Sequence, residues 1–153
     1  MAKKGTLRAV LVGCGGMSRA WLSAAAERSD VDIVGLVDID EKNAQSRAEE
    51  YGLDGAHIGT DLKVVLGEAD PDVVFDVTIP SAHTNVTVTA LKHGCHVLGE
   101  KPLADSMANA RRSLRAAQQA GKIYAVIQNR RYNPNIRRLR RLLAKKPLGQ
   151  LTT

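Results

Sequence analysis

Residues 7–18 read LRAVLVGCGGMS, an apolar run that ends in three glycines and leads into a segment compatible with a helix. This pattern predicts a strand, a tight glycine turn and a helix, the opening of a dinucleotide-binding βαβ unit. Gly13 allows the sharp turn out of the strand, and Gly15, which has no Cβ, lets the main chain approach a pyrophosphate closely. The free N–H groups of the first helical turn then favour the phosphate charge.

Ser18 stands where the G-x-G-x-x-G pattern has its third glycine. A small residue still permits close packing of the helix on the strand, and we expect its hydroxyl to cap a main-chain N–H or to reach a phosphate. Cys14 lies near a helix N-terminus, which lowers a thiol pKa, but we interpret it as an ordinary residue of a variable loop position. Such a turn can also be purely structural, so the prediction of a nucleotide site depends on the motifs in the rest of the chain.

The length and composition predict one globular domain, to which the chain could add only the start of a second. Of 153 residues, 44% are hydrophobic and 25% are charged, and no apolar run approaches the roughly 18–20 residues of a membrane helix. Residues 1–6, MAKKGT, lead directly into the first expected strand, so we expect no secretory signal. Two cysteines suggest neither a disulfide framework nor a metal site, so we expect a cytoplasmic protein without metal or membrane.

The net charge of +6 is concentrated at the end of the chain. Residues 1–128 hold 14 Lys or Arg against 16 Asp or Glu, hence −2, whereas residues 129–153 hold eight Lys or Arg and no acid. Nucleic-acid binding through residues 130–146 is one hypothesis. Leucines interleave with the arginines there, however, which favours an amphipathic helix whose leucines pack on the sheet while its charges stay solvated. Aromatic residues are only 3% of the chain, so we expect no nucleic-acid partner.

Strand and helix patterns alternate six times. The strands are expected at residues 8–12, 31–37, 57–58, 73–78, 96–98 and 123–127. The helices are expected at residues 16–27, 41–51, 82–93, 106–120 and 135–145, with a further small helix that Thr60 caps and Gly67 ends. Asp40 and Gly52 are the expected caps of the second helix. This order predicts an α/β fold with a doubly wound parallel sheet of about six strands in three layers, a Rossmann fold.

The candidate site residues follow the ends of the strands, where such a sheet binds its ligand. Asp38 ends the second strand, 20 residues after Ser18, at the spacing of the acid that binds the adenosine ribose. Asp38 would repel a 2′-phosphate and no Arg follows it directly, which favours NAD over NADP. Thr78 and Pro80 end the fourth strand, where the main chain would line the nicotinamide side of the cofactor. His83 follows near the start of the next helix and would either contact the ligand there or lie on the surface.

Glu100 and Lys101 follow the fifth strand. A lysine held at a strand end beside an acid suits proton transfer, although such a tripeptide with Pro102 is also a common turn.

Residues 94–104, GCHVLGEKPLA, resemble a motif of the Gfo/Idh/MocA oxidoreductase family, which includes sugar and inositol dehydrogenases. The glycine turn, Asp38, the TIP segment 78–80 with His83, and NRRYNP at residues 129–134 agree with this resemblance, which spans residues 7–149.

The resemblance implies an N-terminal NAD(P)-binding domain, residues 1–128. By position, Gly13, Gly15, Gly16 and Met17 would hold the pyrophosphate, Asp38 the ribose, and Thr78, Pro80, His83 and Glu100 would lie near the nicotinamide. Lys101 would be the catalytic lysine, with a cis bond to Pro102, and would bind the reacting hydroxyl of a sugar or polyol. Arg131 and Tyr132 would also face the substrate.

Family members continue for about as long again into a substrate domain, so residues 129–153 are expected to be a basic helix and the start of that domain. We therefore expect a fragment, an isolated domain or the product of a split gene, inactive alone, whose full-length parent is a homo-oligomer. A non-catalytic NAD-binding module is the alternative, which Lys101 argues against. An NAD-dependent glycosidase of the same family also remains open.

Overall fold

Side chains along the first strand alternate between two apolar layers. Ala9 and Leu11 pack into the core cluster that includes Trp21 and Leu22, whereas Val10 and Val12 pack into a second cluster on the other face. Both clusters are buried because each face of a parallel sheet is covered by helices. The computed structural model, which describes residues 5–145 and 149, therefore has the predicted three layers.

The sheet has six parallel strands in the order β3-β2-β1-β4-β5-β6. The strands are β1 (Leu7–Val12), β2 (Val31–Val37), β3 (His57–Gly59), β4 (Val73–Asp76), β5 (His96–Gly99) and β6 (Tyr124–Val126). The strand order reverses between β1 and β4, which are hydrogen-bonded neighbours. This is the switch point of a doubly wound sheet, where a crevice forms beyond the carboxyl ends of the strands.

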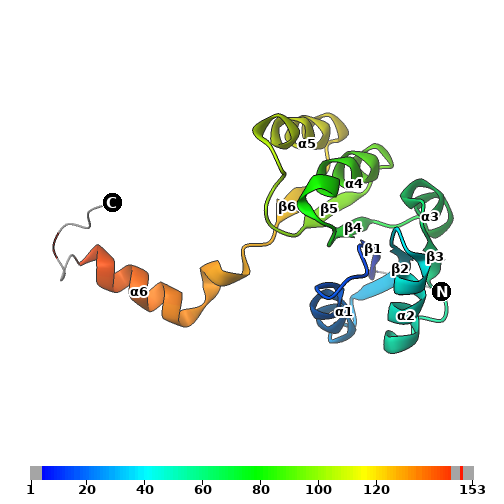
Figure 1. The fold of residues 1–153 in the computed structure, drawn as a ribbon, viewed down its shortest axis with the longest axis horizontal. Helices are drawn as coiled ribbons and strands as arrows, with labels where there is room; N and C mark the ends of the chain where they lie inside the picture. Colours follow the sequence, from blue (N-terminus) through cyan, green and yellow to red (C-terminus); the bar gives the residue numbers. More distant parts are fainter. Residues whose placement is uncertain (1–4, 146–148, 150–153) are drawn as a thin grey trace.

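Two helices cover one face of the sheet and three cover the other (Figure 1). The helices are α1 (Ser18–Ala26), α2 (Glu41–Tyr51), α3 (Leu62–Ala69), α4 (Pro80–Lys92), α5 (Met107–Ala120) and α6 (Pro134–Ala144), with a 3₁₀ helix η1 (Asn129–Tyr132). Helices α1 and α2 contribute to the first cluster, and α3, α4 and α5 to the second. The Rossmann fold predicted from the sequence is confirmed.

Several predicted boundaries shift for local reasons. Asp61, not Thr60, caps α3 by accepting a hydrogen bond from the N–H of Lys63 at 2.8 Å. Helix α3 continues through Gly67 to Ala69 and ends where Asp70 is left-handed, at φ 41°. By contrast, Asp40 and a left-handed Gly52 cap α2 as predicted.

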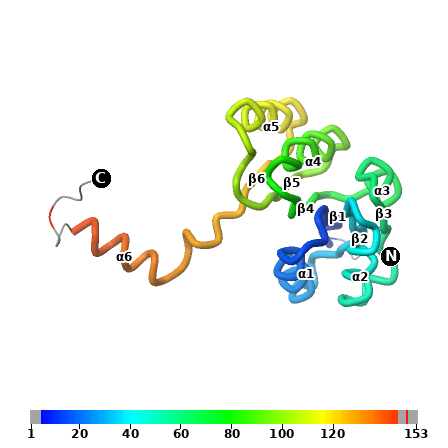
Figure 2. The backbone as a smooth tube through the Cα atoms, viewed as in Figure 1, coloured from blue at the N-terminus to red at the C-terminus, as the bar shows by residue number. Residues whose placement is uncertain are grey.

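Helix α6 leads away from the sheet, as the tube in Figure 2 shows. Its main tertiary contacts are with η1. Ile136, Leu139 and Leu142 are about half exposed, so the amphipathic helix is present but its leucines do not pack on the sheet as expected. Helix α6 ends at Ala144, before Pro147 as predicted. The predicted start of a second domain near residue 149 lies outside the continuous described range.

No helix within residues 5–145 combines the length and the apolar character that a bilayer crossing needs. Among these residues, no group of three or more His, Cys, Asp or Glu side chains lies together as metal ligands would.

Candidate functional site

The loop after β1 requires glycine at its first position. Gly13 has φ +95°, and a Cβ added to it would lie 2.8 Å from the carbonyl carbon and oxygen of Val77 and 2.9 Å from the nitrogen of Thr78. Its N–H donates to the carbonyl of Val37 at 2.8 Å. Gly13 therefore makes the predicted sharp turn, and it also brings the ends of β1, β2 and β4 together at the switch point.

Gly15 and Gly16 border open space instead. A Cβ added to either would meet no atom within 4 Å. Among the described residues, no hydrogen bond to the protein starts from the N–H of Gly15, Gly16 or Met17, the last of which precedes α1. Consecutive free N–H groups at the positive end of a helix are suited to bind an anion such as a pyrophosphate.

Ser18 is fully buried and contacts the protein rather than a ligand. Its hydroxyl donates to the carbonyl of Gly15 at 2.5 Å and accepts from Nε of Arg47 at 3.1 Å. The expectation that this hydroxyl caps an N–H or reaches a phosphate is wrong, because burial turns it toward the loop carbonyl. Close packing of α1 on β1 is preserved.

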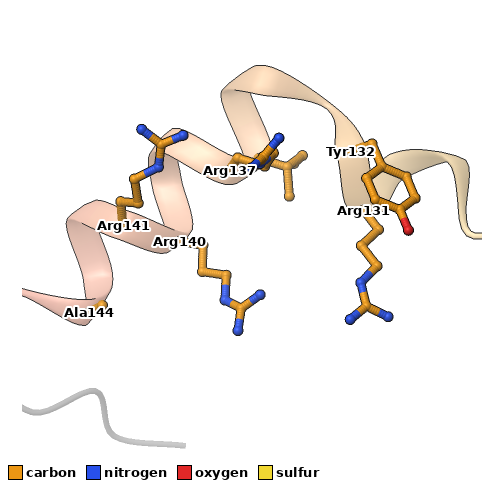
Figure 3. Close-up of a pocket in the computed structure, with 7 residues that line it drawn as sticks. Arg131, Tyr132, Arg137, Arg140, Arg141 and Ala144 are labelled. Carbon is orange, nitrogen blue, oxygen red and sulfur yellow. The ribbon is translucent and has the colours of Figure 1, made fainter.

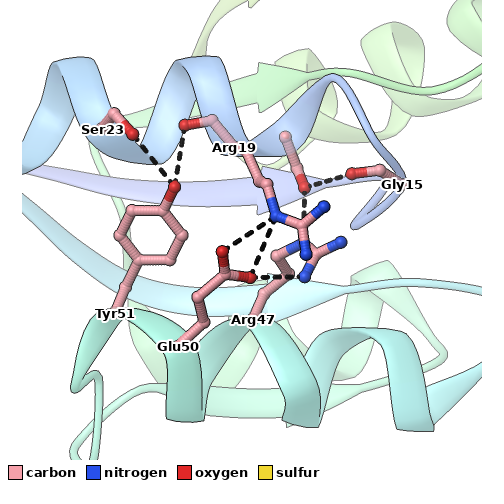
Figure 4. A network of polar contacts seen from close by, with 7 residues as sticks. Gly15, Arg19, Ser23, Arg47, Glu50 and Tyr51 are labelled. Carbon is pink, nitrogen blue, oxygen red and sulfur yellow. Dashed lines mark hydrogen bonds and ion pairs between the residues drawn. The ribbon is translucent and has the colours of Figure 1, made fainter.

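Arg47 is a site neighbour that the sequence analysis missed. It extends from α2 to Ser18, and Glu50 bonds both Arg47, at 2.6 Å, and Arg19, at 2.8 Å (Figure 4). These contacts hold α1 against α2 directly behind the glycine loop. The sequence offered a weak signal, since Arg47 and Glu50 are three residues apart on one helix.

Asp38, at the end of β2, is fixed against the glycine loop. Its Oδ2 accepts from the N–H of Cys14 at 2.7 Å, and its Oδ1 accepts from the N–H of Asp40 at 3.0 Å and from Nδ2 of Asn43 at 3.2 Å. The carboxylate thus stands beside the loop that would hold the pyrophosphate, at the place from which an acid can bind ribose hydroxyls.

Cys14 is buried within this loop. Burial, reinforced by the nearby charge of Asp38, raises the pKa of the Cys14 thiol from 9.0 to about 12, although the positive charge of Arg47 acts in the opposite direction. The thiol is therefore protonated at neutral pH, which excludes the reactive-thiolate reading that the helix N-terminus suggested.

The chain turns at Asp76 instead of continuing as a strand to Thr78. Oδ1 of Asp76 accepts from both the N–H and the hydroxyl of Thr78, at 3.1 and 2.6 Å, and lies 3.1 Å from Nδ1 of His83. Asp76 had no partner that the sequence alone could identify. The structure supplies one, because α4 begins at Pro80 and its first turns bring His83 over the end of β4.

His83 does not lie on the surface. Only 2% of it is exposed, and its ring contacts Asp76 and Thr78 in the interior of the domain. Thr78 is partly buried, and Ile79 and Pro80 are exposed at the turn. The three predicted residues are thus together, with the turn exposed and the imidazole buried beneath it.

Glu100 and Lys101 differ sharply in exposure. Glu100 is buried, and its Oε1 accepts from the indole N–H of Trp21 at 3.1 Å, which ties α1 to the end of β5. Its Oε2 accepts from the N–H of Lys101 at 3.2 Å. Lys101 itself is exposed, and its bond to Pro102 is cis, as the resemblance implied.

An apolar hollow of about 290 Å³ lies next to Glu100, between α1 and the strands β4 and β5. Met17, Trp21, Phe75 and Leu98 contribute to its wall. The sequence analysis did not predict this hollow, since it depends on which parts of the sheet the helices leave uncovered.

Arg131 and Tyr132 lie on η1, beyond the edge strand β6. They line a hollow of about 510 Å³ together with one side of α6. Figure 3 shows Arg131 and Arg140 extending to the same side of this segment. Both predicted residues are exposed. They lie apart from the predicted site residues in the loops that follow β1, β4 and β5.

The comparisons with known proteins agree with this geometry. Residues 7–128 match the family model GFO_IDH_MocA, described as "Oxidoreductase family, NAD-binding Rossmann fold". The chain is 32% identical over 129 residues to 4-carboxy-2-hydroxymuconate-6-semialdehyde dehydrogenase from a Sphingobium species, covering 84% of this chain and 40% of the relative. It is 31% identical over 146 residues to D-glucoside 3-dehydrogenase from Escherichia coli, covering 95% and 41%.

Among solved structures, GenD2 from gentamicin A biosynthesis, in complex with NAD, superposes with a TM-score of 0.82 at 28% identity. The match covers 94% of this chain and 40% of GenD2. The chain thus spans about two fifths of the length of the relatives it matches.

Proposed function

The chain belongs to the Gfo/Idh/MocA oxidoreductase family and is an NAD-binding domain, and from that premise we propose how its residues bind the cofactor and what reaction they serve. The observation that carries the proposal is the meeting of three strand ends at Gly13. Around it lie the free N–H groups of the glycine loop, the fixed carboxylate of Asp38 and the turn after β4.

The pyrophosphate is held by the loop from Gly13 to Met17. The open space at Gly15 and Gly16 gives a phosphate access to the main-chain N–H groups, and the N-terminus of α1 adds its positive dipole. Asp38 binds the adenosine ribose. Its carboxylate would repel a 2′-phosphate, which supports NAD as the preferred cofactor over NADP.

Thr78, Pro80 and Glu100 line the nicotinamide half of the site. The order of the sheet supports this division, because β4 and β5 lie on the opposite side of the switch point from β2. Glu100 also holds the N–H of Lys101 and the indole of Trp21, which keeps the end of β5 in place.

Lys101 is the catalytic residue of the whole protein in this proposal. Bound NAD supplies the hydride acceptor at its nicotinamide ring. The amino group of Lys101 hydrogen-bonds the substrate hydroxyl and receives its proton as the hydroxyl carbon is oxidised. The exposure of Lys101 beside the crevice supports this role, since an amine that contacts substrate must be accessible.

The substrate is a sugar, inositol or related polyol, a class supported by the name of the Escherichia coli relative. Residues 129–153 begin the substrate-binding part of a longer protein, and Arg131 and Tyr132 face the substrate there. The length of the relatives and the uncovered apolar side chains of α6 support this assignment. A cytoplasmic location and a homo-oligomeric parent remain predictions.

Two measurements test the proposal. Calorimetry of this chain should detect NAD binding, and Gly15→Ala should weaken it without a matching loss of thermal stability. A folded sample that binds no NAD would contradict the cofactor site. In the full-length parent, Lys101→Ala should abolish turnover while NAD still binds. Unchanged turnover would mean that a group other than Lys101 is catalytic, and a wild-type parent that binds NAD without any turnover would favour the non-catalytic alternative, for which the named relatives offer no support.

A further inference from the structure

Asp76 and His83 form a buried pair beneath the turn after β4. Asp76 is 1% exposed and His83 is 2% exposed, and Oδ1 of Asp76 lies 3.1 Å from Nδ1 of His83. Burying a carboxylate without a polar partner costs free energy. The contact with His83 offsets part of this cost for Asp76, which lies at the end of an apolar strand.

The same carboxylate oxygen holds the turn. Oδ1 of Asp76 accepts from the N–H of Thr78 at 3.1 Å and from its hydroxyl at 2.6 Å, while the hydroxyl of Thr78 lies 3.3 Å from Nδ1 of His83. The conformation of residues 78–80 therefore depends on where Asp76 places this oxygen. His83 fixes that place from α4, which itself begins at the end of the turn.

The turn lies directly at the switch point. Gly13 packs against the main chain of Val77 and Thr78, and the N–H of Val77 donates to the carbonyl of Val12 at 2.8 Å. In the proposed function a dinucleotide crosses the sheet at this point, with its adenosine half over β1 and β2 and its other half over β4 and β5.

We propose that His83 is a positioning residue for the nicotinamide half of the cofactor, acting through Asp76 on the turn 78–80. The inference rests on the proposed function, since it takes the turn to face the nicotinamide. It differs from a direct contact, because the imidazole is buried away from the crevice. The imidazole acts through Nδ1, because Nε2 has no hydrogen-bond partner among the described residues.

The experiment compares two ligands on variants of this chain. NAD and ADP-ribose share the adenosine and pyrophosphate, but only NAD has the nicotinamide. Calorimetric titrations of each ligand would be made with the wild type, His83→Leu, His83→Asn and His83→Gln. Asn places a donor near the position of Nδ1, whereas Gln places one near Nε2, so the pair identifies the edge of the ring that matters.

Loss of the contacts that Nδ1 makes with Asp76 and Thr78 should weaken NAD binding about tenfold in His83→Leu and His83→Gln, the effect of about one buried polar contact. ADP-ribose binding should stay within about twofold of wild type in every variant. His83→Asn should restore most of the NAD affinity. His93, which is exposed at the other end of α4, provides the control: His93→Asn should change neither ligand.

The other outcomes overturn the inference in distinguishable ways. Equal loss of both ligands in His83→Leu, with a lower melting temperature, would mean that His83 only supports the fold. Undiminished NAD affinity in His83→Leu, or no recovery in His83→Asn, would exclude the proposed contact. Equal wild-type affinities for NAD and ADP-ribose would mean that the turn adds nothing to binding. Wild type that binds neither ligand would instead contradict the proposed cofactor site.

Discussion

The carboxylate of Asp38 accepts a hydrogen bond from the N–H of Cys14 at 2.7 Å, so the end of β2 is fixed to the glycine loop that follows β1. The second oxygen of Asp38 accepts from the N–H of Asp40, which caps α2. One carboxylate thus joins the ribose position, the phosphate loop and the start of the second helix. Changes at Asp38 should therefore alter cofactor choice and local structure together.

Replacing Asp38 by Asn tests its role in cofactor choice. The amide keeps one oxygen acceptor for the loop but removes the negative charge that would repel a 2′-phosphate. We expect NADH affinity to fall about tenfold, because a hydrogen bond from ribose to a charged group is lost, while NADPH affinity falls less or rises. Titrations followed by energy transfer from Trp21, the single tryptophan, measure both. An unchanged ratio of the two affinities would contradict the ribose assignment.

Gly13→Ala and Gly15→Ala should separate stability from binding. At Gly13 the positive φ and the 2.8 Å approach to the main chain of Val77 leave no room for a Cβ, so Ala should lower the free energy of unfolding by about 2 kcal/mol or more. At Gly15 nothing lies within 4 Å, so Ala should leave stability within about 0.5 kcal/mol of wild type. Urea unfolding checks both. Equal destabilisation by the two changes would contradict this assignment of the loop.

The fold could be predicted largely from local patterns. Apolar runs bounded by Gly, Asp and Pro located the strands, and alternation of strands with helices leads to a parallel, doubly wound sheet. Caps were predictable where one residue type was clearly suited, as for Asp40 and Gly52. Beside α3, both Thr60 and Asp61 can cap, and only the observed bond to Lys63 distinguishes them.

For the candidate site, the sequence predicted which residues lie at strand ends, but not which side chains contact one another or are buried. The sequence placed Gly13, Asp38, Thr78 and Lys101 at strand ends, and the order of the sheet brings the first three together at the switch point. It could not show that His83 turns inward to Asp76, because that contact depends on the start of α4. Likewise, burial reverses the pKa shift that the helix N-terminus alone suggests for Cys14.

The buried thiol of Cys14 predicts weaker folding at alkaline pH. In the unfolded chain the thiol ionises near its ordinary pKa of 9.0, whereas in the folded protein burial raises the pKa of Cys14 to about 12. Between these values the unfolded state binds fewer protons, so this group's contribution to stability is complete below pH 9 and is lost as pH rises toward 12.

Cys14→Ala removes this contribution. We expect wild type to lose on the order of 1 kcal/mol more than the variant between pH 8 and pH 10, since at pH 10 the thiol is ionised in the unfolded chain but still protonated in the folded protein. Urea unfolding at the two pH values measures the difference, and a thiol reagent should label Cys14 quickly only in urea. Parallel loss of stability in wild type and Cys14→Ala would contradict the assigned shift.

Removing α6 should leave the sheet domain intact. The main tertiary contacts of α6 are with η1, and its apolar residues Ile136, Leu139 and Leu142 remain about half exposed. A variant ending at Asn133 therefore loses little buried apolar surface, and its melting temperature should stay within about 2 °C of wild type. As a control, Leu91→Ala, which removes a core side chain between α4 and the sheet, should cost about 2–5 kcal/mol. If the shortened chain lost as much stability as Leu91→Ala, α6 would pack against the sheet domain in solution.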